Sequence, residues 1–494
     1  MASTTYAMSV LVVDVGTTGV RAAVVREDAT IVGFTYAPLP PTSPFPGLVE
    51  FDGVAMREAV LGVAHAALAA GDAVRAVGIT AQRASTIMWD ARTGEPLAPG
   101  LGWQDLRTVG DCIRLRGEKG LVFAPNQTAT KLTWLRANVE AARSPHARVG
   151  TVDTWVAAVL SNFSVHATDS SNAAVTGLAD HASLTKHTWS ASVLDALNIN
   201  PSALPRIAPT MSTIGTASAL PGAPPIMAMV GDQQASLVGQ GGVVPGAAKA
   251  TFGTGGMLDM YSGTVTPPHL ARTSAGTFPI VVYSQGNTLH WGAEAIMLTA
   301  GSNVEWLVSD MGLIPNAVAS DALAASVTSS DGVVFVPSLI GMGTPHWDYG
   351  ARGTLLGLTR GTTKAHVVRA VLEGVAHRGA DLLEACERDS GLHVDQLRVD
   401  GGMSRNGVFV QALSNATMRP VAVCRDTEAT TLGAAFLAGV SAGVWSSLGE
   451  AAALVAPLRV VEPTETNTSV VRAQWHEAVS RSRGWIPELS ALDF

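Results

Sequence analysis

Three short segments join an apolar run to a glycine turn that carries threonine, aspartate or both, and each could bind phosphate. They are Asp14-Val-Gly-Thr-Thr, Phe252-Gly-Thr-Gly-Gly and Asp400-Gly-Gly. Glycine turns expose backbone N–H groups, and threonine adds hydroxyls, so such turns suit oxyanions. Two of them facing each other across a cleft could hold a nucleoside triphosphate between two domains.

The first segment offers the fuller set of groups. Asp14, at the end of a strand, can hold hydrated magnesium, and Thr17 and Thr18 can bind phosphate. Arg21 lies one turn further on and can reach the same anion. Taken alone, an ordinary hairpin with glycine and threonine in its turn explains the segment equally well.

Asp232 is the best candidate for a general base. It follows the apolar run 226–230, so it should end a buried segment near the junction of two domains. A carboxylate there could accept a proton from a substrate hydroxyl. A helix N-cap is the alternative interpretation, and both can be true.

Further polar residues follow other strand-like runs. Gln82-Arg83 and Trp103-Gln-Asp supply hydrogen-bonding groups and one apolar wall, which is the equipment of a polyol pocket. In the third glycine segment, Asn406 could contact a nucleobase or ribose. Each of these groups, taken separately, also fits a surface or structural role.

The elements that must position these residues alternate between strands and helices. Residues 9–15, 20–25 and 76–80 read as strands, and a helix should run from its cap Asp52 to Gly71. This alternation predicts an α/β fold. The Pro- and Gly-rich stretch 215–230 reads as a connector, and we place the domain boundary near residue 240, giving domains 8–240 and 241–494. Later helices should start at the cap Thr363 and cover 471–485.

Composition narrows the function classes. The 494 residues are 47% hydrophobic and 15% charged, with a net charge of −8, which disfavours nucleic acid and anionic membranes as partners. Three dispersed cysteines suit a reducing compartment. Neither a signal peptide nor an apolar stretch of about 20 residues is evident, so we expect a cytoplasmic protein. Any metal should be a hard cation held by oxygen ligands.

Taken together, the segments resemble the FGGY carbohydrate kinases, and the glycerol kinases within that family most closely. The resemblance spans essentially the whole chain in family order. It rests on Asp14-Val-Gly-Thr-Thr-Gly-Val-Arg, Gly78-Ile-Thr-Ala-Gln-Arg, Trp103-Gln-Asp-Leu-Arg-Thr, Thr168-Asp-Ser-Ser-Asn-Ala, Gly231-Asp-Gln-Gln, Phe252-Gly-Thr-Gly, Phe335-Val-Pro, Pro345-His-Trp-Asp, Arg352-Gly, Gly357-Leu and Val399-Asp-Gly-Gly.

The resemblance implies two ribonuclease-H-like domains, as in actin and hexokinase, flanking a central cleft that closes on ATP and a sugar or polyol. It implies Asp232 as catalytic base and magnesium organised by Asp14 and Asp232. The implied ATP contacts are Thr17, Thr18, Arg21, Thr254, Gly255, Gly301, Glu305, Gly402 and Asn406. The implied substrate set is Arg83, Trp103, Asp232 and Gln233, with positions Ala84 and Asn126.

The chain departs from the glycerol kinase pattern at three of these positions. Ala84 stands where those enzymes carry Glu, Asn126 where they carry Tyr, and Glu305 where they usually carry Gln. Replacing Glu by Ala removes a hydroxyl acceptor and opens volume. The first two changes, in the glycerol-binding set, argue against glycerol and leave room for a longer polyol or a ketose.

We therefore expect ATP-dependent phosphorylation of a terminal hydroxyl of a small polyol or sugar. A tetritol or pentulose kinase of the same family is one alternative. A non-catalytic nucleotide- and sugar-binding sensor is another, and the retained Asp14, Asp232 and phosphate turns argue against it. A chaperone-like or filament-forming ATPase would not need the Gln-Arg, Trp-Gln-Asp and Gly-Asp-Gln-Gln set. A homodimer or homotetramer is compatible with this assignment.

Overall fold

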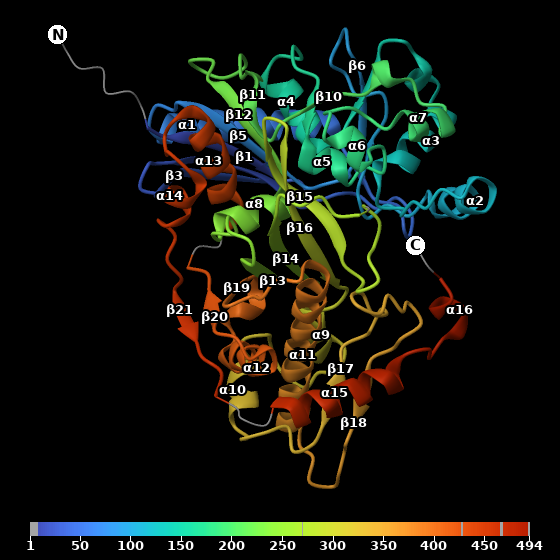
Figure 1. The fold of residues 1–494 in the computed structure, drawn as a ribbon, viewed down its shortest axis with the longest axis vertical. Helices are drawn as coiled ribbons and strands as arrows, with labels where there is room; N and C mark the ends of the chain where they lie inside the picture. Colours follow the sequence, from blue (N-terminus) through green and yellow to red (C-terminus); the bar gives the residue numbers. More distant parts are fainter. Residues whose placement is uncertain (1–7, 269, 426–427, 465–467, 493–494) are drawn as a thin grey trace, which may run out of the picture.

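In a computed structural model of the chain, one mixed 13-stranded sheet passes through both halves of the molecule (Figure 1). The structure describes residues 8–268, 270–425, 428–464 and 468–492. In spatial order the strands are β21 (Arg459–Val461), β20 (Val421–Val423), β19 (Leu397–Asp400), β13 (Ala248–Phe252), β14 (Gly256–Gly263), β16 (Thr288–Met297), β15 (Phe278–Gln285), β11 (Met211–Thr216), β12 (Pro225–Gly231), β5 (Ala76–Ala81), β1 (Val10–Val15), β2 (Gly19–Val25) and β3 (Ile31–Pro38). The expected α/β class is confirmed.

Strand register places three loops of the first half at one edge of the sheet. β1 and β12 both run parallel to β5, and Val15 and Gly231 are both aligned with Ala81. The residues that follow these strand ends therefore come close together. Helix α1 (Gly53–Ala70) covers β2 and β3, and Asp52 caps it as predicted by accepting hydrogen bonds from the N–H groups of Val54 and Ala55.

The expected connector over residues 215–230 is wrong. β11 and β12 occupy half of it and pair antiparallel, with a turn over 217–224. Proline and glycine concentrate in that turn, and Pro225 opens β12, a position at which a strand tolerates proline. The proline and glycine of this one turn made the whole stretch look like a connector, although two strands of the central sheet flank the turn.

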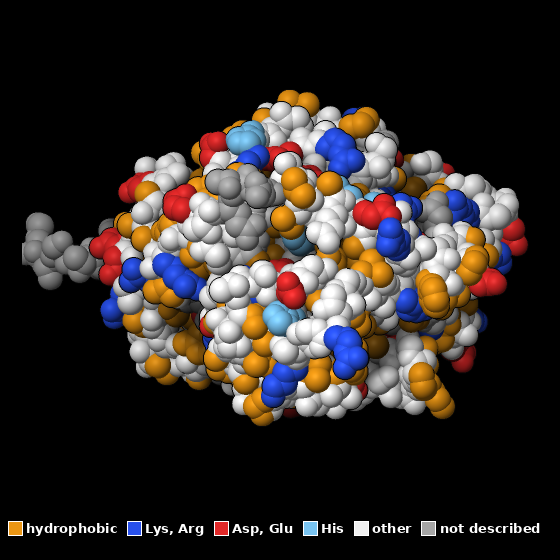
Figure 2. All heavy atoms as spheres, turned by 90° about the horizontal axis from the view of Figure 1, so that it is seen from below, with side chains coloured by type: hydrophobic (Ala, Val, Ile, Leu, Met, Phe, Trp, Pro, Cys, Tyr) orange, Lys and Arg blue, Asp and Glu red, His pale blue; other side chains and the backbone are white. Residues whose placement is uncertain are grey.

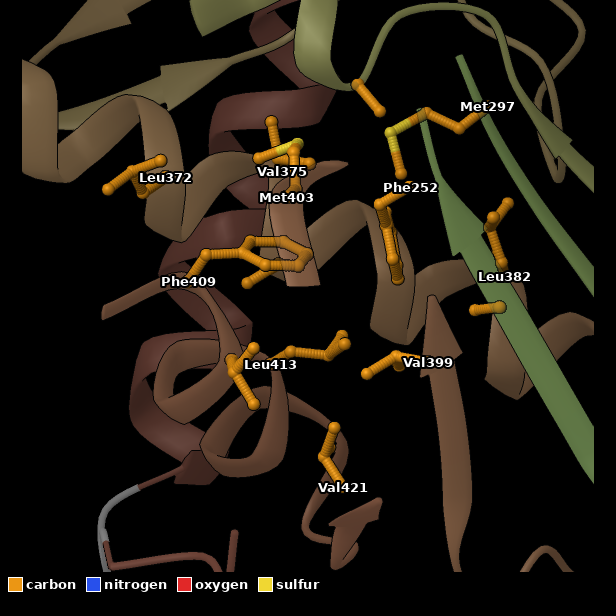
Figure 3. Packing of buried hydrophobic residues seen from close by; sticks show 14 of the residues in the cluster. Phe252, Met297, Leu372, Val375, Leu382, Val399, Met403, Phe409, Leu413 and Val421 are labelled. Atoms are coloured by element: carbon orange, nitrogen blue, oxygen red, sulfur yellow. The ribbon is translucent and has the colours of Figure 1, made fainter. Parts of the chain in front are cut away.

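The second half repeats the strand-to-loop arrangement. β13 runs parallel to β19, with Thr251 aligned with Asp400, so the glycine loops that follow them are neighbours. Gly401 has a φ of +85°, and a Cβ there would lie 2.5 Å from the carbonyl oxygen of Phe252, so the position needs glycine. Phe252 packs edge-on against Phe409 in the core beneath these loops (Figure 3).

Helices α9 (Gly301–Ser309), α10 (Ala319–Ala325), α11 (Lys364–Ser390) and α12 (Gly407–Thr417) surround this second core. The predicted start of α11 at the cap Thr363 is confirmed. Its Gly374 packs on β17 (Val334–Val336), where a Cβ would lie 2.1 Å from the carbonyl oxygen of Phe335.

One helix from the second half of the sequence covers strands of the first half. α13 (Ala429–Ala442) packs on β1, β5 and β12 and crosses α8 (Asp232–Gly239) (Figure 1). The crossing depends on Gly239 and Gly433, since a Cβ on either would lie within 2 Å of a carbonyl oxygen of the other helix. α8 carries Asp232 at its first turn, so this close contact helps fix that residue.

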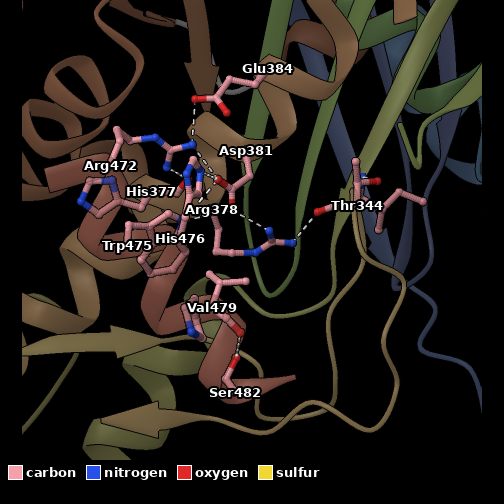
Figure 4. Close-up of polar contacts among 12 residues, drawn as sticks. Thr344, His377, Arg378, Asp381, Glu384, Arg472, Trp475, His476, Val479 and Ser482 are labelled. Atoms are coloured by element: carbon pink, nitrogen blue, oxygen red, sulfur yellow. Dashed lines mark hydrogen bonds and ion pairs between the residues drawn. The ribbon is translucent and has the colours of Figure 1, made fainter. Parts of the chain in front are cut away.

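The terminal helix α15 (Thr468–Ser482) lies against α11, close to the expected range. Arg472 donates to Asp381 and Glu384, and Trp475 Nε1 donates to Asp381 (Figure 4). Arg378 pairs with the same Asp381 at 2.7 Å. Asp381 is therefore held between two guanidinium groups. Although burial opposes it, a hydrogen bond with His476 and the charges of Arg378 and Arg472 keep the pKa of this carboxyl well below its usual range.

Two features of the molecule bear on its partners, one apolar helix and the charge distribution of one face. Among the described residues, α1 alone is long and apolar enough to cross a membrane, but Met56, Val60, Val63 and Ala67 are buried against the sheet, as in a core helix. On the face shown in Figure 2, basic and acidic side chains are interspersed with apolar ones.

Candidate active site

Asp14 and Arg21 face each other across the β1–β2 hairpin. Arg21 Nη1 lies 3.1 Å from Asp14 Oδ2, and Asp14 is 2% exposed. Burial raises the pKa of Asp14 from 3.8 to about 7 against the opposing charge of Arg21, and Asp232 raises it further. A carboxylate in such a position is stabilised by a nearby cation, and its oxygens are the ligands that Mg²⁺ prefers.

The turn between β1 and β2 links the predicted phosphate residues to the predicted substrate residues. Gly16 N–H donates to the carbonyl of Gly19, which closes the turn, and Thr18 is exposed at its tip. Trp103 Nε1 donates to Thr17 Oγ1 at 3.2 Å. The indole and the turn are therefore in direct contact.

Asp232 lies at the end of β12, as predicted, and is the first residue of α8, with Gly231 as the N-cap. Its Oδ1 accepts from the N–H of Gln233 at 2.8 Å and lies 3.8 Å from Arg83 Nε. Burial raises the pKa of Asp232, and the charge of Arg83 opposes this. Ser171 Oγ accepts from the N–H of Gly231 and so holds the strand end in place.

Arg83 connects the two halves of the chain. Its Nη2 lies 2.6 Å from Glu294 Oε2 on β16, and the same group contacts the sulfur of Met257 on β14. Burial raises the pKa of Glu294 to about 7, against the charge of Arg83. Sequence reasoning missed Glu294, although a glutamate inside the apolar run 289–297 was a usable signal.

A second buried ion pair supports Gln233. Lys249 Nζ lies 2.9 Å from Asp259 Oδ2 and also donates to Gln233 Oε1 at 2.8 Å and to Thr251 Oγ1 at 3.2 Å. Lys249 and Asp259 are almost fully buried on adjacent strands β13 and β14. Neither residue was predicted from the sequence, and again the usable signal was a charged residue inside a buried strand.

Two of the three positions that depart from the glycerol kinase pattern, Ala84 and Asn126, lie on segments that touch each other. Ala84 is buried with a φ of +63°, and its carbonyl accepts from Thr128 Oγ1 at 3.1 Å. Asn126 is exposed on the segment before Thr128, and its carbonyl accepts from the buried Lys131 ammonium at 2.8 Å. Asp105, by contrast, is engaged with Arg107 and the N–H of Val49, which is a structural role.

A cavity of about 890 Å³ lies beside the glycine loops of the second half and brings together five predicted nucleotide residues: Thr254, Gly301, Glu305, Gly402 and Asn406. Gly301 N–H donates to the carbonyl of Gly253, so α9 starts against the glycine loop. Gly255 follows in the same loop, next to the carbonyl of Met297. The Asn406 amide caps α12 and donates to Ser320, so it is already hydrogen-bonded within the protein.

The sequence matches the N-terminal domain of the FGGY family of carbohydrate kinases over residues 9–239 and the C-terminal domain over 248–442. The chain belongs to the FGGY family of carbohydrate kinases. It is 40% identical to a glycerol kinase of Bordetella parapertussis and 38% identical to one of Trichlorobacter lovleyi, covering 96% of this chain and 97% and 99% of those proteins.

Solved structures agree with this assignment. The Plasmodium falciparum glycerol kinase determined with ADP superposes with a TM-score of 0.89 at 27% identity, covering 96% of this chain and 98% of that one. A xylulose kinase of Rhodospirillum rubrum has the same fold, with a TM-score of 0.85 at 24% identity, and covers 96% of this chain and 98% of its own. This FGGY kinase is thus an ATP-dependent phosphotransferase that acts on a polyol or sugar, as expected.

Proposed function

We propose that Asp232 is the catalytic base of this kinase and that it accepts the proton of a terminal substrate hydroxyl as that oxygen attacks the γ-phosphorus of ATP. The observation that carries the proposal is the convergence of Asp14, Arg83 and Asp232 at three strand ends aligned in one sheet: Asp14 is the last residue but one of β1, and the other two follow β5 and β12. Burial raises the pKa of Asp232, which makes it a better proton acceptor than an ordinary aspartate. Arg83, 3.8 Å away, stabilises the ionised form.

Asp14, with Asp232 close by, would hold Mg²⁺. When bound, the ion offsets charge on the ATP phosphates. Thr17, Thr18 and Arg21 then bind phosphate from the first half, and Thr254 and Gly255 do so from the second. The cavity lined by Gly301, Glu305, Gly402 and Asn406 takes the nucleoside. Water exclusion between the two halves protects ATP from hydrolysis.

The acceptor is a small polyol or ketose bound by Arg83, Trp103 and Gln233. Glycerol is supported by the names of the relatives, whereas Ala84 and Asn126 favour a four- or five-carbon substrate. The lost carboxylate at position 84 leaves one glycerol hydroxyl without its strong acceptor, at a cost of about 1–3 kcal/mol. We therefore propose a longer substrate, with a cytoplasmic location and a symmetric dimer or tetramer.

A panel of C3 to C6 polyols and ketoses, assayed for ADP production, tests this. Glycerol should have a kcat/KM roughly one to three decades below the best four- or five-carbon compound. In Ala84→Glu the glycerol value should rise, and Ala84→Gln is the matched control that adds length without charge. If glycerol has the highest kcat/KM in the wild type, the longer-substrate proposal is wrong and glycerol is the acceptor.

A further inference from the structure

The orientation of the Gln233 amide is fixed by a lysine. An ammonium group has three N–H donors and no acceptor, so an amide that bonds to it must present its oxygen. Lys249 Nζ has three acceptors within 3.2 Å: Asp259 Oδ2, Gln233 Oε1 and Thr251 Oγ1. Lys249 and Asp259 are buried, whereas Gln233 is only partly buried. The Gln233 oxygen therefore points inward to the lysine, and its NH₂ group is left to donate to the substrate.

The other substrate-side groups are also donors. Arg83 has only N–H groups, and the ion pair with Glu294 at 2.6 Å holds it in place. Trp103 offers only its indole N–H, which contacts Thr17. Position 84 carries a methyl group, so it supplies no acceptor. Among these four residues and Asp232, the Asp232 carboxylate is the sole side-chain acceptor left for the substrate, because the Gln233 oxygen already accepts from Lys249. The reacting hydroxyl requires that carboxylate.

We infer that Lys249 and Asp259 are specificity-determining positioning residues: by holding Gln233 as a donor, they select a carbonyl oxygen over a hydroxyl next to the phosphorylated carbon. The substrate class is then a short ketose in its open-chain form. An alditol of the same length has a hydroxyl there, whose hydrogen would find no acceptor among these groups. This inference rests on the proposed function of the same site.

An aldonate also has acceptor oxygens, but it carries a negative charge, so the charge balance of the site decides between an aldonate and a ketose. Around the site, Arg83 and Lys249 face three carboxylates, Asp232, Asp259 and Glu294. The cluster therefore has no excess positive charge with which to stabilise a carboxylate of the substrate. A neutral carbonyl fits both the hydrogen-bonding groups and the charge.

The test compares ketose and alditol of equal carbon number: dihydroxyacetone with glycerol, erythrulose with erythritol, and xylulose with xylitol. The ratio of their kcat/KM values should be at least about tenfold in favour of the ketose at the preferred length. A ratio at or below one at every length overturns the inference while leaving the kinase assignment intact. Absence of turnover on every compound would instead overturn the proposed function.

Two variants test the role of the amide. Gln233→Glu replaces the amide donor by a carboxylate acceptor, so the ketose-to-alditol ratio of kcat/KM should fall at least about tenfold. Lys249→Met removes the group that fixes the Gln233 amide, which can then flip, so the ratio should move toward one. Gln411→Glu makes the same chemical change on α12, where Gln411 bonds Asn415, and should keep the wild-type ratio. Partial misfolding lowers both kcat/KM values equally, so the ratio reports selectivity even in a destabilised variant. An unchanged ratio in Gln233→Glu refutes the role assigned to Lys249.

Discussion

Gly301→Ala should disturb ATP binding through one defined contact. A Cβ on Gly301 would lie 2.6 Å from the carbonyl oxygen of Gly253, the atom that accepts the Gly301 N–H. The separation must grow by about 0.8 Å to reach the 3.4 Å at which ordinary contact begins. The Gly253–Thr254 loop is also tied to Ala300 by a hydrogen bond, so it should move as a unit. Overpacking of this size costs about 1–3 kcal/mol.

A loop displaced by nearly 1 Å should raise the KM for ATP about ten- to a hundredfold, because such misplacement can cost 10²-fold in rate. Initial rates with ATP varied at saturating acceptor measure the change, and ATP-induced protection against thermal unfolding measures it independently. The acceptor KM should change little. Gly62→Ala in α1 is the matched control, since a Cβ there meets no atom within 4 Å. If Gly301→Ala has a wild-type KM for ATP and wild-type stability, the proposed packing of α9 on the glycine loop is refuted.

Three further predictions concern charged groups. Asp232→Asn should keep ATP and acceptor binding but lower kcat by about 10²–10⁴-fold, because an amide oxygen can still accept from the Gln233 N–H but cannot take a proton; wild-type turnover would disprove the assignment. Asp14→Ala should raise the magnesium concentration needed for half-maximal rate more than the acceptor KM, and an unchanged magnesium midpoint and maximal rate contradict it. Burial lowers the pKa of Lys131 from 10.5 to about 7, so the folded protein holds fewer protons than the unfolded chain between these values. The wild type should therefore gain about 1.4 kcal/mol of stability per pH unit relative to Lys131→Met as pH rises above 7. Urea unfolding of both proteins at pH 7 and pH 9 measures this difference. If the difference in unfolding free energy between the two proteins is the same at both pH values, the reasoning is wrong.

Local patterns predicted the parts of this fold that depend on local chemistry. The β1–β2 hairpin follows from two apolar runs on either side of a glycine turn. The capped starts of α1 and α11 follow from apolar spacing after a capping residue. The same reasoning failed over residues 215–230, because the proline and glycine of the turn 217–224 dominated the composition of a stretch that also contains parts of β11 and β12. The crossing of α13 onto the first half has no local signal either, because it depends on contacts between Gly239 and Gly433, about 200 residues apart.

In the candidate site, too, local patterns predicted some residues and not others. Asp14, Arg83 and Asp232 were predictable because each lies at or just after the end of an apolar strand, and parallel strands end at one edge of a sheet. Glu294 and Asp259 were not, since they meet only through the antiparallel register of β14 and β16. A charged residue inside a buried strand signals that a partner exists. Which partner it has depends on the three-dimensional arrangement of strands.

That arrangement explains why the substrate cannot be deduced from the residues that touch it. Gln233 as a residue type offers both a donor and an acceptor, and only the Lys249–Asp259 pair behind it decides which one faces the substrate. Arg83 is likewise held by Glu294, a residue 211 positions away in the sequence. Two FGGY kinases with the same substrate-contacting residues could therefore differ in selectivity if their supporting charges differ. Specificity in this site should be sought in the buried strands β13, β14 and β16 as much as in the loops that contact the substrate.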